Sequence, residues 1–236
     1  MDIQSQKALK VLVVRFANEI AQYEIPLFRG AVIDAVGQEN GLLFHNHVGE
    51  GFRYAYPMIQ YKRIGGKAAI VCVGDGVDEI GKFFSACNFE IMIGERRVHL
   101  EVERMTPVKM RVQVWNGDFE YRLRGWLPLN HANYELYKTM DGVIERTRLL
   151  ERVLVGNILS MCKGVGIEVD KEIVCKITQV GEMRLATFKG VKTNCVDIEF
   201  HSNMSLPDFI GIGKGSSLGF GIVTRKKNHT NIKNDE

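Results

Sequence analysis

Hydrophobic and polar positions in the first half of the chain follow two alternating periods. Runs that are rich in β-branched residues, or that alternate apolar and polar positions, are typical of strands. Such runs occupy residues 9–16, 58–64, 67–73 and 98–105. Apolar residues at helical spacing over 24–37 and 75–88 predict two helices between them. The resulting order, β-α-β-β-α-β, is that of a ferredoxin-like domain, which is also the plan of many RNA-recognition folds.

Proline and glycine positions support this segmentation. Pro26 is tolerated in the first turn of a helix, and Gly37 is a suitable end for it. Gly65-Gly66 suits a two-residue hairpin turn between the second and third strands. In the last strand, the alternation places Val102 on the buried face.

The second half predicts a second, less regular ferredoxin-like domain. Two strand-like runs flank Asn116-Gly117-Asp118, a typical hairpin signal. A long helix is expected over 141–163, with Asp141 as its N-cap. Further strands are expected over 172–180, 185–191, 194–200 and 220–224. With a boundary at Thr106-Pro107, the fold class is α+β, with domains over 1–108 and 109–236.

Composition indicates a soluble globular protein and by itself gives no sign of a nucleic-acid partner. Of 236 residues, 45% are hydrophobic and 25% charged, and the formal net charge is only +3. The longest apolar run, 68–73, is far too short to span a membrane, and no secretory signal is visible. Five widely spaced cysteines without a CxxC motif predict buried free thiols in a cytoplasmic protein.

A glycine-rich segment over 211–221 is the most unusual local feature. Five glycines occur in eleven residues, accompanied by Lys214 and, shortly after, by Arg225. Backbone N–H groups of such a segment can approach a phosphate closely. The segment matches neither a P-loop nor a dinucleotide fingerprint. We expect phosphate or RNA contact, with a tight packing connection as the alternative. The glycines are Gly211, Gly213, Gly215, Gly219 and Gly221.

Two histidines, His45 and His47, lie two residues apart after the first predicted helix. In extended backbone their side chains share a face. Imidazoles titrate near neutrality, so the pair could serve as acid and base in catalysis. Local structural hydrogen bonding is an equal alternative. Metal binding is the least favoured, because no third or fourth ligand stands at metal-like spacing.

The next segment, 53–63, interleaves three tyrosines with three basic residues. Such a pattern can stack bases and neutralise phosphates of a single strand, or it can be an ordinary amphipathic strand.

Together these motifs resemble those of the CRISPR-associated repeat-RNA-processing endoribonucleases of the RAMP superfamily. Residues 211–221 match that family's C-terminal glycine signature: Gly, hydrophobic, Gly, five residues, Gly, hydrophobic, Gly. The histidine pair followed by 56–62 is similar to the branch with paired histidines. The resemblance covers nearly the whole chain, including the long helix.

The resemblance implies tandem ferredoxin-like domains that bind CRISPR repeat RNA and cut it once without a metal or other cofactor. Attack by the 2′-hydroxyl would leave a 2′,3′-cyclic phosphate and a 5′-hydroxyl. His45 and His47 would be acid and base in either order, with Tyr54, or alternatively Tyr56, as a supporting hydroxyl. Lys62 would stabilise the charge that develops on the phosphorus centre. RNA contacts are expected from the glycines above and from Arg29, Arg53, Tyr56, Arg63, Lys214 and Arg225.

Two alternatives stay open at this point. One is a repeat-RNA-binding subunit of a CRISPR effector complex that does not cleave, and the other is a histidine-dependent metal enzyme or nucleotide-binding protein. Effector-complex proteins and a second copy of the chain are further possible partners, and no membrane partner is expected.

Overall fold

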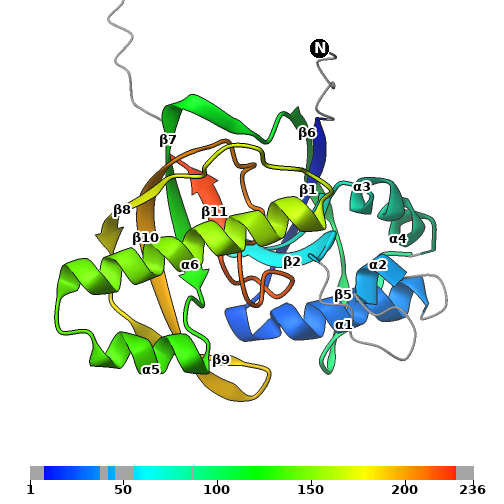
Figure 1. Cartoon of the computed structure of the whole chain (residues 1–236). Coiled ribbons are helices and arrows are strands. Elements are labelled where there is room, and N and C mark those ends of the chain that lie inside the picture. The colour runs from blue at the N-terminus through cyan, green and yellow to red at the C-terminus, as the bar shows by residue number, and fades with distance from the viewer. Residues whose placement is uncertain (1–7, 38–41, 46–55, 87, 227–236) are drawn as a thin grey trace, which may run out of the picture.

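The computed structural model describes residues 8–37, 42–45, 56–86 and 88–226, with only the backbone given for Leu42 and His45. Two sheet-rich domains follow one another along the chain (Figure 1). This arrangement confirms the α+β class with two ferredoxin-like domains.

The first domain is built on a four-stranded antiparallel sheet with the order β2-β3-β1-β6, the ferredoxin-like order. A small hairpin, β4-β5, lies outside that sheet. Its elements are β1 (Leu9–Glu19), η1 (Gln22–Glu24), α1 (Ile25–Val36), α2 (Leu42–His45), β2 (Ile59–Ile64), β3 (Lys67–Val73), α3 (Gly76–Glu79), α4 (Gly81–Ala86), β4 (Glu90–Ile93), β5 (Arg96–His99) and β6 (Val102–Met110).

Local sequence signals placed the first helix and the first hairpin well. Gly37 ends α1 with φ of 82°, a value that glycine adopts without strain. Gly65 and Gly66 form the two-residue turn between β2 and β3, with φ of 60° and 87°. Both predictions are confirmed.

Two predictions in this domain are wrong. The helix expected over 75–88 is two short helices, α3 and α4, separated at Ile80. The strand expected over 98–105 is divided between β5 and β6, and Val102 is 37% exposed instead of buried. The register of β1 against β6 shifts between Arg15 and Phe16, opposite this point, so the alternation does not continue across the break.

The second domain has a sheet with the order β11-β7-β10-β8, to which β9 adds by pairing with β10. If β7, β8, β10 and β11 are counted as the four strands of this domain, their order in the sheet is again the ferredoxin-like one. The glycine-rich segment runs where the second helix of such a domain would lie, between β10 and β11. The elements are β7 (Val114–Trp126), α5 (His131–Thr139), α6 (Val143–Gly164), β8 (Cys175–Val180), β9 (Arg184–Phe188), β10 (Val191–Met204) and β11 (Ile222–Arg225).

Two sequence expectations fail here, and one helix was missed. No hairpin forms at Asn116-Gly117-Asp118, because these residues lie inside β7, which pairs with the 14-residue β10 on both sides of them, at Val114 and at Phe119. Long-range pairing therefore overrides a local turn signal. The N-cap of α6 is Gly142, not Asp141, and α5 was not predicted.

The first sheet is buried on both faces. One face packs under α1, and the other contributes Val11, Val13 and Val71 to a core shared with α6 and the second sheet. Figure 1 accordingly shows α1 and α6 on opposite sides of β2. The shared core fixes the two domains against each other.

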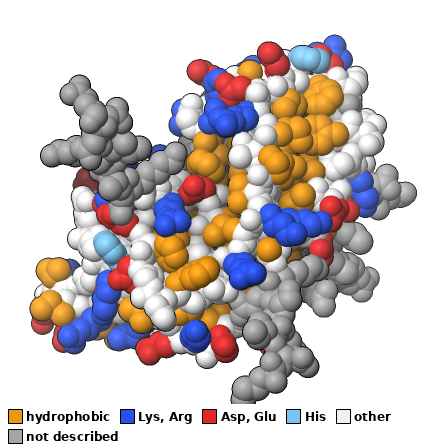
Figure 2. Space-filling model, turned by 90° about the horizontal axis from the view of Figure 1, so that it is seen from above, with side chains coloured by type: hydrophobic (Ala, Val, Ile, Leu, Met, Phe, Trp, Pro, Cys, Tyr) orange, Lys and Arg blue, Asp and Glu red, His pale blue; other side chains and the backbone are white. Residues whose placement is uncertain are grey.

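The described cysteines, Cys72, Cys162, Cys175 and Cys195, are buried free thiols, as predicted. Among the helices that the structure describes, none combines the length and apolar composition needed to cross a membrane. The surface seen in Figure 2 mixes hydrophobic, basic and acidic side chains and presents no continuous field of one charge. This agrees with the small net charge.

Candidate functional site

The glycine-rich segment, called here the glycine loop (211–221), passes through a space too narrow for side chains. A Cβ atom at Gly219 would lie 2.6 Å from Cδ1 of Ile25 in the first domain. A Cβ atom at Gly221 would collide with the carbonyl oxygen of Ile212, and φ at Gly221 is 60°. Close packing therefore accounts for these two glycines, which was the alternative considered from the sequence.

The first domain grips the glycine loop through polar side chains of β2 and the turn before it. Tyr56 donates its hydroxyl hydrogen to the carbonyl of Gly211 at 2.9 Å, and the N–H of Gly211 donates to Oε1 of Gln60 at 2.8 Å. The ammonium of Lys62 donates to the carbonyl of Ser216 at 2.6 Å. Three predicted residues, Tyr56, Lys62 and Gly211, are thus brought together.

At the apex of the loop, Lys214 is exposed and its neighbours Gly213 and Gly215 are partly buried. The N–H groups of Gly213, Lys214 and Gly215 have no hydrogen-bond acceptor among the residues that the structure describes. Consecutive free amides beside a lysine can bind an anion. The predicted chemistry of phosphate contact is therefore available at the apex.

Aromatic rings lie beside this apex. Nζ of Lys214 is 5.2 Å from the ring centroid of Phe188, and Phe188 meets Phe220 edge to face at 5.7 Å. Nζ of Lys189 lies 5.8 Å from the same Phe188 ring. We call Phe188, Lys189, Lys214 and Phe220 the aromatic–basic patch. Sequence reasoning missed Phe188 and Lys189, although an aromatic–basic pair at a strand end is itself a visible signal.

Lys62 lies in a different environment from the one predicted. Its side chain is completely buried, and burial lowers its pKa to about 7. A direct contact with RNA would require the glycine loop to leave β2. Tyr56 is also partly enclosed, and burial raises the pKa of its hydroxyl.

The remaining basic candidates are dispersed. Arg63 donates from Nε to the carbonyl of Ile20 at 2.6 Å, and Arg225 stacks over Phe119 at 4.7 Å. Arg29 is partly buried on α1, where its charge acts on the hydroxyl of Tyr61.

Several predicted residues lie outside the described part of the chain, namely Arg53, Tyr54 and His47. His45 is the last residue of α2, and only its backbone is described. Phe44 beside it is buried in the core beneath α1. The described chain resumes at Tyr56, which already contacts the glycine loop. Phe44 belongs to the core beneath α1, whereas Tyr56 packs against the core that the first sheet shares with α6.

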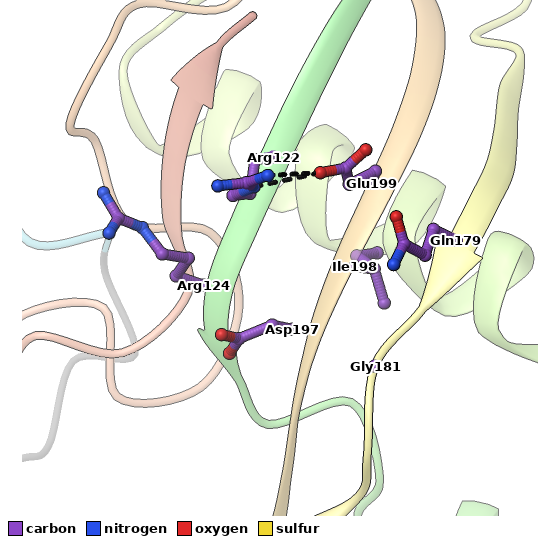
Figure 3. Close-up of a pocket in the computed structure, with 7 residues that line it drawn as sticks. All are labelled: Arg122, Arg124, Gln179, Gly181, Asp197, Ile198 and Glu199. Carbon is purple, nitrogen blue, oxygen red and sulfur yellow. Dashed lines mark hydrogen bonds and ion pairs between the residues drawn. The ribbon is translucent and has the colours of Figure 1, made fainter.

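A hollow of about 210 Å³ lies elsewhere, on the outer face of the second sheet (Figure 3). Its charged groups are largely paired with one another: Arg122 with Glu199, and Asp197 with Arg184 and the N–H of Gly125. None of the predicted site residues lines it. The lining is formed by Arg122, Arg124, Gln179, Gly181, Asp197, Ile198 and Glu199.

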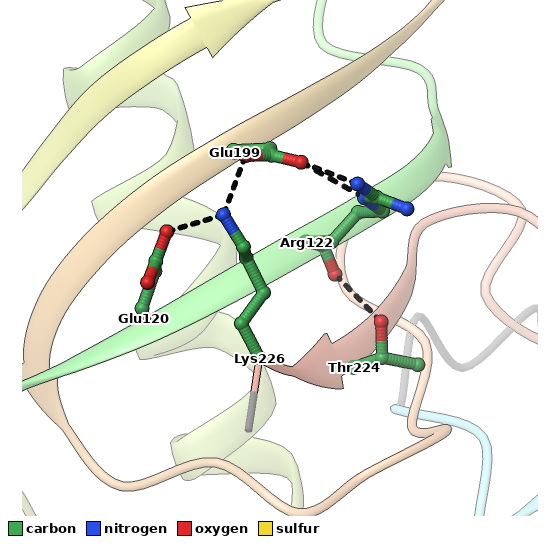
Figure 4. Close-up of polar contacts among 5 residues, drawn as sticks. All are labelled: Glu120, Arg122, Glu199, Thr224 and Lys226. Carbon is green, nitrogen blue, oxygen red and sulfur yellow. Dashed lines mark hydrogen bonds and ion pairs between the residues drawn. The ribbon is translucent and has the colours of Figure 1, made fainter. Parts of the chain in front are cut away.

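The same outer face also binds Lys226, which follows β11. Lys226 bridges Glu120 and Glu199, and Arg122 joins the network through Glu199 (Figure 4). These contacts neutralise Lys226, whereas the side chains of Arg225 and Lys214 form no ion pair with the described residues.

Two ferredoxin-like domains, a shared core and a glycine loop clasped between them define the class of tandem ferredoxin-like proteins with a C-terminal glycine signature. The sequence matches the Cas6b N-terminal domain over residues 7–111 and the Cas6b C-terminal domain over 113–226. The chain belongs to the Cas6b family of CRISPR RNA processing endoribonucleases.

Comparisons with individual proteins agree with this assignment. A solved structure described as "Crystal structure of Cas6b" superposes with a TM-score of 0.79 at 27% identity, covering 93% of this chain and 100% of the other. "Crystal structure of CRISPR RNA processing endoribonuclease Cas6b" gives 0.70 at 25% identity, with the same coverage. An uncharacterized protein of Methanocaldococcus jannaschii, MJ0978, is 37% identical over 144 residues, covering 58% of this chain and 97% of its own length.

Proposed function

We propose that this protein cleaves CRISPR repeat RNA in a metal-independent reaction. The observation that carries the proposal is the apex of the glycine loop, where Lys214 is exposed between two glycines, in a chain of the Cas6b family. Three N–H groups without an acceptor in the described part of the chain, together with the ammonium of Lys214, offer a site for phosphate. Phe188 and Phe220 offer rings on which a base can stack.

The proposed chemistry is an internal transfer at phosphorus. A base removes the proton of the 2′-hydroxyl, the 2′-oxygen bonds to phosphorus, and the bond to the 5′-oxygen breaks. An acid protonates the departing oxygen, which leaves a 2′,3′-cyclic phosphate and a 5′-hydroxyl. No electrons are exchanged with an external reagent, and protons taken and given balance.

We assign the roles of acid and base to His45 and His47. Before them in the chain, Phe44 is buried, and after them Tyr56 is hydrogen-bonded to Gly211. Tyr54 is the preferred supporting hydroxyl, because that of Tyr56 is already engaged with Gly211. A charge-stabilising contact by Lys62 is not retained, since its ammonium is enclosed.

The test uses a repeat RNA incubated with the protein in EDTA, beside the same RNA carrying a 2′-deoxy sugar at the cut position. We expect cleavage of the first, with cyclic phosphate ends, and none of the second. A requirement for added metal, or cleavage of the deoxy substrate, would overturn the mechanism. Tight binding of both RNAs without any cleavage would instead identify a repeat-binding subunit.

A further inference from the structure

Contacts from β2 and from the residues just before it hold the glycine loop on both sides of its apex. Before the apex, Gly211 is bound by Tyr56 and Gln60. After it, Ser216 accepts from Lys62 at 2.6 Å. The backbone of the same strand adds a further bond, because the N–H of Tyr61 donates to the carbonyl of Ser217 at 3.0 Å, and Tyr61 pairs in parallel with Leu218. The apex, 213–215, lies between these two points of attachment.

The side chains that make these contacts are costly for the fold. Gln60 and Lys62 have no exposed surface, and they lie on the strand face that carries Ile64 into the core between the domains. Burial of an ammonium is unfavourable unless a carboxylate or several acceptors compensate. In the described part of the chain, Lys62 has one acceptor, the carbonyl of Ser216, and no ion pair. An apolar side chain at this position would cost the folded state less free energy, so stability alone does not explain the lysine.

The bond from Lys62 fixes the orientation of a peptide group in the loop. In a planar trans peptide the carbonyl and the following N–H point in opposite directions. The carbonyl of Ser216 points to Lys62 inside the protein, so the N–H of Ser217 points away from it. The same side chain thus sets the direction in which the loop leaves its apex.

We propose that Tyr56, Gln60 and Lys62 form a clamp that pre-shapes the apex of the glycine loop to receive an RNA phosphate. This inference rests on the proposed function and assigns these three as positioning residues, which act on RNA only through the loop. A loop already ordered in its binding shape loses less entropy when RNA binds, so the clamp acts on affinity. The clamp also joins the RNA-binding loop to the chain that directly follows the candidate Tyr54.

The affinity of repeat RNA and its cleavage rate at saturation separate a clamp from a catalytic lysine. Lys62→Met removes the ammonium and keeps an apolar side chain of similar length. We expect the Kd of the RNA to rise roughly tenfold, with the single-turnover rate at saturating protein within about threefold of that of the unaltered protein. Lys138→Met is the matched control, because the contacts of Lys138 are confined to α5. An unchanged Kd for Lys62→Met would overturn the clamp, whatever happens to the rate.

Tyr56→Phe supplies a second test that alters neither charge nor ring, and it decides the matter if Lys62→Met does not fold. It deletes only the hydroxyl that binds Gly211. We expect Kd to rise roughly threefold to tenfold. A Kd equal to that of the unaltered protein would mean that the tyrosine acts through its ring, and the clamp would be wrong. If the unaltered protein neither binds nor cuts the RNA, the proposed function fails first and the clamp with it.

Discussion

Nζ of Lys62 lies 2.6 Å from the carbonyl oxygen of Ser216, although 154 residues separate the two in sequence. This bond connects β2 of the first domain to the glycine loop of the second. Both groups are buried, so the contact is shielded from water and salt. It makes the shape of the loop dependent on the first domain.

The burial of Lys62 predicts a pH dependence of stability. Burial lowers its pKa from the ordinary 10.5 to about 7. Below pH 7 the lysine is charged in both states, and the folded protein bears the full cost of burying the charge. Between pH 7 and 10.5 only the unfolded state keeps the proton, so stability rises with pH, by at most about 1.4 kcal/mol per unit. Above 10.5 the effect is complete.

We therefore expect Lys62→Met to have a flatter profile of unfolding free energy than the unaltered protein between pH 7 and pH 9.5. Urea unfolding at several pH values measures this difference. Lys138→Met should keep the original slope, because the lysine it replaces is exposed. Equal slopes for Lys62→Met and the unaltered protein would show that the amine is not buried in solution.

Replacement of the paired histidines should separate cleavage from binding. His45→Ala and His47→Ala each remove a proposed proton-transfer group, and we expect cleavage to slow by about 100-fold or more. The Kd of the RNA should stay within a few-fold of its original value. His131→Ala, at the start of α5, is a suitable control. Unchanged cleavage in both variants would exclude the assignment.

The aromatic–basic patch should contribute to RNA affinity in two distinguishable ways. Phe188→Ala removes the ring beside Lys214, and we expect a loss of about 1–3 kcal/mol in binding, if one base stacks there. For Lys214→Met, the slope of the logarithm of the binding constant against the logarithm of the salt concentration should become shallower by about one, because one phosphate contact is lost. Titrations at several salt concentrations measure both effects. Normal affinity and slope in both variants would place the RNA elsewhere.

Gly221 and Gly65 allow backbone strain to be separated from steric collision. Both have φ of 60°, but a Cβ atom at Gly65 meets nothing within 4 Å, whereas one at Gly221 meets the backbone of Ile212. We expect Gly65→Ala to cost about 1–2 kcal/mol of unfolding free energy. Gly221→Ala should cost clearly more, measured by thermal or urea unfolding. Equal losses of unfolding free energy in the two variants would mean that the glycine loop can shift to accommodate the added methyl group.

The sequence determined the local elements where one signal acted without competition. Pro26 and Gly37 delimited the first helix, and Gly65-Gly66 fixed the hairpin of β2 and β3, because such turns depend on nearby residues alone. It also determined the family signature in the glycine loop. It could not determine the fate of Asn116-Gly117-Asp118, where pairing with distant β10 outweighs a local turn preference.

Tertiary structure alone decided what the candidate residues contact. In sequence, Lys62 is one of several lysines suited to meet a phosphate, and Phe188 is one aromatic among many. Packing of the two domains around a shared core enclosed Lys62 beneath the glycine loop, and folding within the second domain brought the ring of Phe188 beside Lys214. Burial and proximity arise from residues far apart in the chain, so no local pattern specifies them. The sequence thus determined which chemistry is present, and the packing of the two domains decided where each group can act.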